Sequence, residues 1–73
     1  MMNLIQSTVG RSYSVQNICT ASPDLDSLLL LMGCRKGASV SLLSRWGDSC
    51  DIAVQGNQYN IENRLAEGIW IVE

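Results

Sequence analysis

Residues 39–56 read SVSLLSRWGDSCDIAVQG, and this stretch decides the fold. Apolar and polar residues alternate along both of its halves, which is the period of a strand buried on one face. The residues expected on the buried face are Val40, Leu42, Trp46, Cys50, Ile52 and Val54. Gly47-Asp48-Ser49 separates the two halves and is typical of a hairpin turn. The stretch therefore predicts two antiparallel strands joined by a tight turn.

Upstream of this hairpin, the sequence predicts a first strand and one short helix. Tyr13 and Val15 alternate with polar residues in the segment 12–19, which we interpret as a strand. Ser22-Pro23-Asp24 follows with a capping hydroxyl, a proline suited to the first helical turn and an acidic group near the positive end of the helix dipole. A helix is therefore expected over residues 24–32. Its apolar stripe is Leu25, Leu28, Leu29 and Met32, and Gly33 is typical of the residue that ends a helix.

Downstream of the hairpin, residues 55–58 predict a second turn, 59–61 a short strand, 62–67 a helical turn and 69–72 a closing strand. About five short strands, with one short α-helix after the first, indicate a mainly β fold that closes or nearly closes into a small barrel. Closure would remove the unpaired strand edges of such a sheet. A length of 73 residues leaves room for a single domain, 1–73.

Composition and charge exclude several classes of partner. Five Lys and Arg residues stand against seven Asp and Glu residues, which gives a net charge of −2, and there is no His. This balance provides no basic footprint for nucleic acid. The longest apolar run, residues 28–32, is far shorter than the roughly 18 residues of a membrane span, and residues 1–8 lack the features of a secretory signal. We expect a cytoplasmic protein without direct membrane insertion.

The reactive side chains argue against an enzyme. No His can act as a base near neutral pH, no Ser or Cys lies in a nucleophile motif, and no glycine loop matches a phosphate-binding pattern. Asp24 with Asp26, and Asp48 with Asp51, fit either a weak cation site or ordinary caps and turn formers, and we favour the second interpretation. We therefore assign no catalytic residue, no cofactor and no metal site.

The three cysteines have no spacing typical of a metal site. Cys19, Cys34 and Cys50 lie about fifteen residues apart, without a CxxC pair. Their odd number suits a reducing compartment. Cys50 is expected in the core. Cys34 precedes Arg35 and Lys36, whose charges are predicted to lower the pKa of its thiol and to make it the most reactive of the three.

The predicted helix carries more leucine than one buried stripe requires. Leu30 and Leu31 lie off the stripe, and Arg35 with Lys36 follows at the same end of the helix. In so small a domain, a helix has few surfaces against which it can bury apolar residues on all sides. One interpretation is that these four residues form a docking patch with a basic rim. The other is a wider core stripe, with positive charge that favours the helix C-terminus.

The order of these elements resembles the FeoA family, the small cytosolic accessory proteins of bacterial ferrous iron uptake. The resemblance rests on Met32-Gly33 after the leucine-rich helix, Gly37, the Gly47-Asp48 turn, IAVQG at 52–56 and IWI at 69–71. Each motif alone is weak, but their order and spacing together are moderately specific. The resemblance covers nearly the whole chain, from about residue 13 to residue 72.

The resemblance implies an SH3-like β-barrel that docks, without catalysis, on the cytosolic GTPase-containing part of the membrane iron transporter FeoB. The predicted partner-binding residues are Leu30, Leu31, Arg35 and Lys36. The chain is also similar to the C-terminal domain of iron-dependent repressors, so one alternative is binding of ferrous or another transition metal ion by carboxylates such as Asp48 and Asp51, or by the thiols. Another alternative is a homo-oligomeric interaction module that uses the same leucines.

Overall fold

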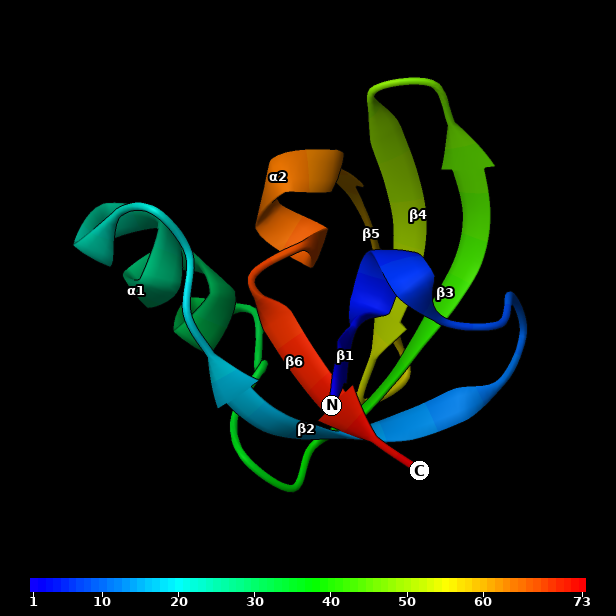
Figure 1. The fold of residues 1–73 in the computed structure, drawn as a ribbon, viewed down its shortest axis with the longest axis horizontal. Helices are drawn as coiled ribbons and strands as arrows, with labels where there is room; N and C mark the ends of the chain where they lie inside the picture. The colour runs from blue at the N-terminus through cyan, green and yellow to red at the C-terminus, as the bar shows by residue number, and fades with distance from the viewer.

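The computed structural model describes residues 1–73 and consists of one antiparallel sheet with two α-helices and a 3-10 turn (Figure 1). The strands are β1 (Met2–Asn3), β2 (Ser12–Ile18), β3 (Ser39–Trp46), β4 (Ser49–Val54), β5 (Asn57–Glu62) and β6 (Ile69–Val72). The helical segments are η1 (Leu4–Gln6), α1 (Pro23–Leu31) and α2 (Asn63–Ala66). The strands lie in the order β1-β6-β2-β3-β4-β5, so the chain is mainly β, as predicted.

The predicted hairpin is confirmed as β3 and β4, which pair in antiparallel register from Val40↔Val54 to Trp46↔Ser49. Val40 and Leu42 on β3 are buried, and so are all three apolar residues predicted on β4. Trp46 was expected beside them and is instead 62% exposed. The reason is a shift of register between Leu42 and Ser44, where one extra residue inverts the alternation of the strand.

The sheet has six strands rather than about five, because the N-terminal segment adds β1. Met2 pairs with Ile71 and Asn3 with Trp70, so β1 extends the sheet beyond β6. Asn3 then caps η1, since its side chain accepts a hydrogen bond from the backbone N–H of Gln6. Leu4 in η1 is fully buried in the core. A two-residue strand and a single turn show no periodicity, and the one local signal is the capping-box pair Asn3 and Gln6, which was not recognised in the sequence.

Helix α1 begins one residue earlier than predicted. Fewer residues of its predicted apolar stripe are buried against the core than expected. Leu29 is fully buried, whereas Leu25 and Met32 are half-buried against the core. Leu28 is 44% exposed, so its assignment to the buried stripe was wrong. Figure 1 shows α1 at one side of the molecule, beyond the end of β2, so that part of the helix surface faces away from the sheet. None of the helices has the length and apolar character needed to cross a membrane.

Candidate docking site

A groove of about 660 Å³ lies between β2, α1 and the turn that follows α1, and we call it the α1–β2 groove. The strand contributes Gln16, Asn17 and Ile18 to its lining. The helix contributes Asp26 and Leu30, and the turn contributes Arg35 and Lys36. Two apolar side chains therefore lie among polar and charged ones in the lining of the groove.

The start of α1 is fixed by the loop that leads into it. The Ser22 hydroxyl accepts a hydrogen bond from the backbone N–H of Asp24 (3.2 Å), as predicted for an N-cap. Asp26 Oδ1 accepts two bonds from Thr20, one from its backbone N–H (2.7 Å) and one from its hydroxyl (2.6 Å). These bonds from Thr20 lower the pKa of the Asp26 carboxyl. Asp26 therefore secures the helix to its loop.

The same loop lies directly against Gly68, which precedes β6. The backbone N–H of Cys19 donates to the Gly68 carbonyl (2.8 Å). A Cβ atom at Gly68 would lie 3.0 Å from the carbonyl oxygen of Cys19 and 3.1 Å from Cα of Thr20, which is too close for an ordinary contact. Only glycine lets the two segments approach this closely, and their contact sets the position of α1 relative to the barrel.

Helix α1 ends in a complete Schellman motif. The N–H of Cys34 donates to the carbonyl of Leu29 (3.0 Å), and the N–H of Gly33 donates to that of Leu30 (3.0 Å). Gly33 takes the left-handed conformation that this motif requires, with φ of 98°. The motif directs Cys34 into the core, where it is fully buried.

The prediction that Cys34 is the most reactive thiol was wrong. Burial raises its pKa to about 11, because the thiolate would lose its solvation. Arg35 and Lys36 lie next to it in the chain, but their side chains are exposed while the thiol is enclosed. Cys50 is also buried, as predicted, and Cys19 is the exposed cysteine.

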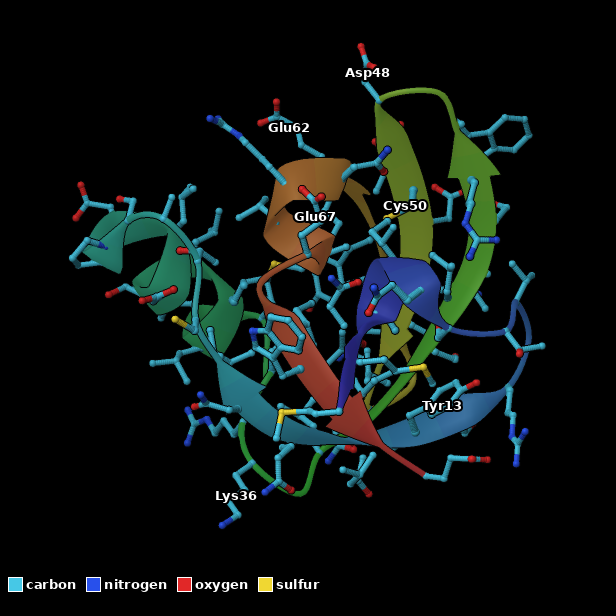
Figure 2. The ribbon with its side chains drawn as sticks, viewed as in Figure 1. Tyr13, Lys36, Asp48, Cys50, Glu62 and Glu67 are labelled. Atoms are coloured by element: carbon cyan, nitrogen blue, oxygen red, sulfur yellow. The ribbon has the colours of Figure 1, made fainter.

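The turn that carries Arg35 and Lys36 is held against β2 by two backbone hydrogen bonds. The N–H of Gly37 donates to the carbonyl of Val15 (2.8 Å), and the N–H of Val15 donates to the carbonyl of Ala38 (2.9 Å). Gly37 has φ of 90°, which favours glycine at this position. Figure 2 shows the Lys36 side chain extending outward from this turn. The two cations are therefore presented on a fixed backbone rather than on a free loop.

The structure brings three of the four predicted partner-binding residues together. Leu30, Arg35 and Lys36 line the α1–β2 groove, while Leu31 lies outside it on the same helix. Leu30 is 44% exposed and Leu31 is 85% exposed, so the alternative of a wider core stripe is wrong. The wall supplied by β2 was not predicted, because the sequence does not show where that strand turns away from its neighbour.

Of the two acidic residues considered for a cation site at the β3–β4 hairpin, Asp51 already accepts hydrogen bonds from side chains and Asp48 lies apart from it in solvent. Asp51 Oδ1 accepts from Asn60 Nδ2 (2.9 Å), while Oδ2 accepts from Trp46 Nε1 (2.7 Å) and the Ser44 hydroxyl (2.9 Å). The hydrogen bond from Asn60 lowers the pKa of Asp51 most, and those from Trp46 and Ser44 lower it further. Asp48 extends into solvent at the tip of the β3–β4 hairpin (Figure 2). No three His, Cys, Asp or Glu side chains gather in a geometry that could hold a metal ion.

Comparison with known proteins shows which family the chain belongs to. The family model described as "FeoA domain" matches residues 2–73. A solved structure described as an iron uptake regulatory protein (FeoA) has a TM-score of 0.83 and 24% identity over 96% of this chain and 93% of its own. The FeoA protein from Chlorobium tepidum has a TM-score of 0.81 and 25% identity over 96% of this chain and 68% of its own. No curated protein matches the sequence.

The same fold occurs in a manganese-dependent transcriptional repressor, with a TM-score of 0.86 and 19% identity over 97% of this chain. This chain spans only 40% of the repressor's length, so the similarity concerns one part of that protein and its fold alone. Together these structures confirm the predicted SH3-like barrel.

Proposed function

The chain belongs to the FeoA family, and from this premise we propose that it is a noncatalytic cytosolic accessory protein of bacterial ferrous iron uptake. In this proposal it docks on the cytosolic, GTPase-containing part of a FeoB-type membrane transporter. The docking surface consists of Leu30 and Leu31 on α1 together with Arg35 and Lys36 in the following turn. A role in iron uptake is supported by the family match and by the description of a related structure as an iron uptake regulatory protein.

The single observation that most supports docking is the exposure of two adjacent leucines beside two cations that have no partner. Leu31 is 85% exposed on a capped helix, whereas Leu29, two residues before it, is fully buried in the core. Leucines of this kind supply most of the affinity when a partner covers them, and charges at the rim orient the encounter. The absence of His and of a nucleophile motif supports a role without catalysis.

The test compares the double variant Leu30→Glu/Leu31→Glu with the control Leu28→Glu. Leu28 and Leu30 are each 44% exposed on α1, but only Leu30 lines the groove. We expect the double variant to fold, to lose copurification with the cytosolic part of the transporter by about tenfold or more, and to lower ferrous iron uptake. Leu28→Glu should retain binding within about twofold.

Circular dichroism of each variant shows whether it is folded. A folded double variant that binds the transporter as well as the wild type would rule out the leucines as the docking surface. Absence of any binding between the wild-type chain and the transporter would rule out the transporter as the partner.

Direct metal sensing is the second candidate, and the manganese-dependent repressor of the same fold is the observation that favours it. Its weakness is the lack of free ligands, since the carboxylate of Asp51 is already occupied by three donors. Anaerobic calorimetry with Fe²⁺ distinguishes the two candidates. Heat of binding at micromolar metal would support sensing, and a flat titration at millimolar metal would exclude it.

A further inference from the structure

One edge of strand β2 has no partner where it lines the α1–β2 groove. On one side, β2 pairs with β6 from Ser14 to Ile18. On the other side, its register with β3 covers only Ser12, Tyr13 and Ser14, and the last backbone bonds are those of Val15 with the turn after α1. Beyond Val15, no strand pairs with the edge of residues 16–18 that faces away from β6.

A bulge explains why the edge is open. The register between β2 and β6 shifts between Val15 and Asn17, so Gln16 is the extra residue. A bulge bends its strand and increases the local twist. This bend coincides with the point at which β2 leaves β3, and Figure 1 shows the end of β2 reaching past the sheet toward α1. An open strand edge is a template for an added strand.

The charge of the groove is unbalanced at the end formed by the turn. Arg11 pairs with Glu73, and Arg64 pairs with Glu62 (3.2 Å). Arg45 donates to the carbonyl oxygens of Ile5 (2.7 Å) and Ser7 (3.0 Å).

Arg35 and Lys36 are the two cationic side chains with no ion pair and no hydrogen bond, and both lie at the groove. The one carboxylate of the lining, Asp26, sits near the start of α1 and accepts from Thr20. The far end of the groove therefore attracts negative charge in a chain whose net charge is −2.

We propose that the α1–β2 groove binds an extended, acidic segment of the partner protein, which adds as a strand to the free edge of residues 16–18. This inference rests on the proposed docking function and specifies the chemistry of the partner. Carboxylates of the segment pair with Arg35 and Lys36, and branched apolar side chains on its other face contact Ile18 and Leu30. At about 3.3 Å per residue, three to four residues of the segment span the free edge.

The experiment uses two synthetic hexapeptides, acetyl-EVEITV-amide and acetyl-KVKITV-amide, titrated into the ¹⁵N-labelled full chain. We expect the acidic peptide to shift the backbone amide resonances of residues 16–18 and of Leu30. The lysine peptide should bind at least about fivefold more weakly, because its charges meet Arg35 and Lys36. A version of the acidic peptide that is N-methylated at alternate residues cannot donate to a strand edge and should lose binding altogether.

A charge-matched pair of variants isolates the two cations. Arg35→Glu/Lys36→Glu and Arg11→Glu/Arg64→Glu change the net charge equally, and all four side chains are exposed. We expect the first variant to bind the acidic peptide about tenfold more weakly and the second to bind within about twofold of the wild type. Equal weakening in both variants, or equal binding of the N-methylated peptide, would overturn the inference.

A binding experiment with the cytosolic part of the transporter distinguishes failure of this inference from failure of the docking proposal. If the cytosolic part of the transporter binds the wild-type chain and an excess of the acidic peptide displaces it, both stand. If the transporter binds but neither the peptide nor Arg35→Glu/Lys36→Glu affects it, the groove inference fails, Arg35 and Lys36 are not part of the docking surface, and docking through the leucines stands. If the peptide binds as described and the transporter does not, the groove chemistry stands and the proposed partner is wrong.

Discussion

Cysteine accessibility in this protein is decided by the backbone at each position rather than by neighbouring charge. Cys34 occupies the position of the Schellman motif whose side chain turns back onto the helix, so it joins Leu29 in the core. Cys50 lies on the inner face of β4. Burial raises its pKa, and the negative charge of Asp51 raises it further. Cys19 lies at the end of β2 and is exposed.

Thiol labelling checks this ordering. We expect iodoacetamide at pH 8 to modify Cys19 rapidly and to modify Cys34 and Cys50 at least about a hundredfold more slowly, because each buried thiol reacts only after local or global unfolding. Mass spectrometry of tryptic peptides over time gives the three rates. Cys19→Ser should remove the rapid phase entirely. A rapid phase that persists in this variant would show that one of the inner thiols is accessible in the folded chain.

The β3–β4–β5 sheet is organised on its outer face by the bulge in β3. The shift of register at this point moves Trp46 from the core to the outer face, where its ring N–H donates to Asp51. Asn60 on β5 donates to the same carboxylate, so one side chain on the central strand links all three strands. The alternation in the sequence predicted the hairpin correctly, but the bulge was missed, although the adjacent Leu42 and Leu43 interrupt the alternation at the position of the extra residue.

Acid should weaken this part of the sheet. The pKa of Asp51 is lowered in the folded chain, so its carboxylate contributes stability above the pKa of the unfolded group, about 3.9, and that contribution is lost as the pH falls through the lower folded value. We expect the urea midpoint of the wild type to fall between pH 5 and pH 2. In Asp51→Asn, the midpoint at pH 7 should be lower and the loss on acidification smaller.

Asp48→Asn is the matched control, since the Asp48 carboxylate accepts no hydrogen bond and lies at the tip of the same hairpin. It should lower the midpoint at pH 7 much less than Asp51→Asn does. Asp26, whose pKa is also lowered, should leave part of the acid sensitivity in Asp51→Asn. An unchanged acid dependence in Asp51→Asn would show that the three hydrogen bonds contribute nothing to the folded state.

Across the whole molecule, local sequence patterns predicted most of the helices and strands. Pairing between segments distant in sequence determined how these elements are arranged. The hairpin, the capped helix, the closing strand and the exposure of Leu30 and Leu31 all follow from residues close in sequence. The second wall of the groove does not, because it depends on where β2 leaves β3. The addition of the N-terminal segment to the sheet does not either, because it depends on pairing between β1 and β6, whose residues are about seventy positions apart.

The N-terminal segment should also stabilise the fold through its buried side chain, Leu4. Leu4 is fully buried where η1 crosses between β6, β3 and α2, and Arg45 holds the segment in place through the carbonyls of Ile5 and Ser7. Leu4→Ala should cost about 2–5 kcal/mol in the free energy of unfolding. A core of this size rarely supplies more than about 3–5 kcal/mol in total, so much of the variant should be unfolded at 25 °C. Urea denaturation followed by far-UV circular dichroism measures the change.

Ile5→Ala, at the half-buried neighbouring position, is the control and should cost roughly half as much or less, because its side chain retains contact with solvent. Arg45→Met keeps the aliphatic stem but removes both bonds to the N-terminal segment, and it should destabilise the chain in the same direction as Leu4→Ala. A Leu4→Ala midpoint equal to that of the wild type would mean that burial of the Leu4 side chain does not contribute to the stability of the fold.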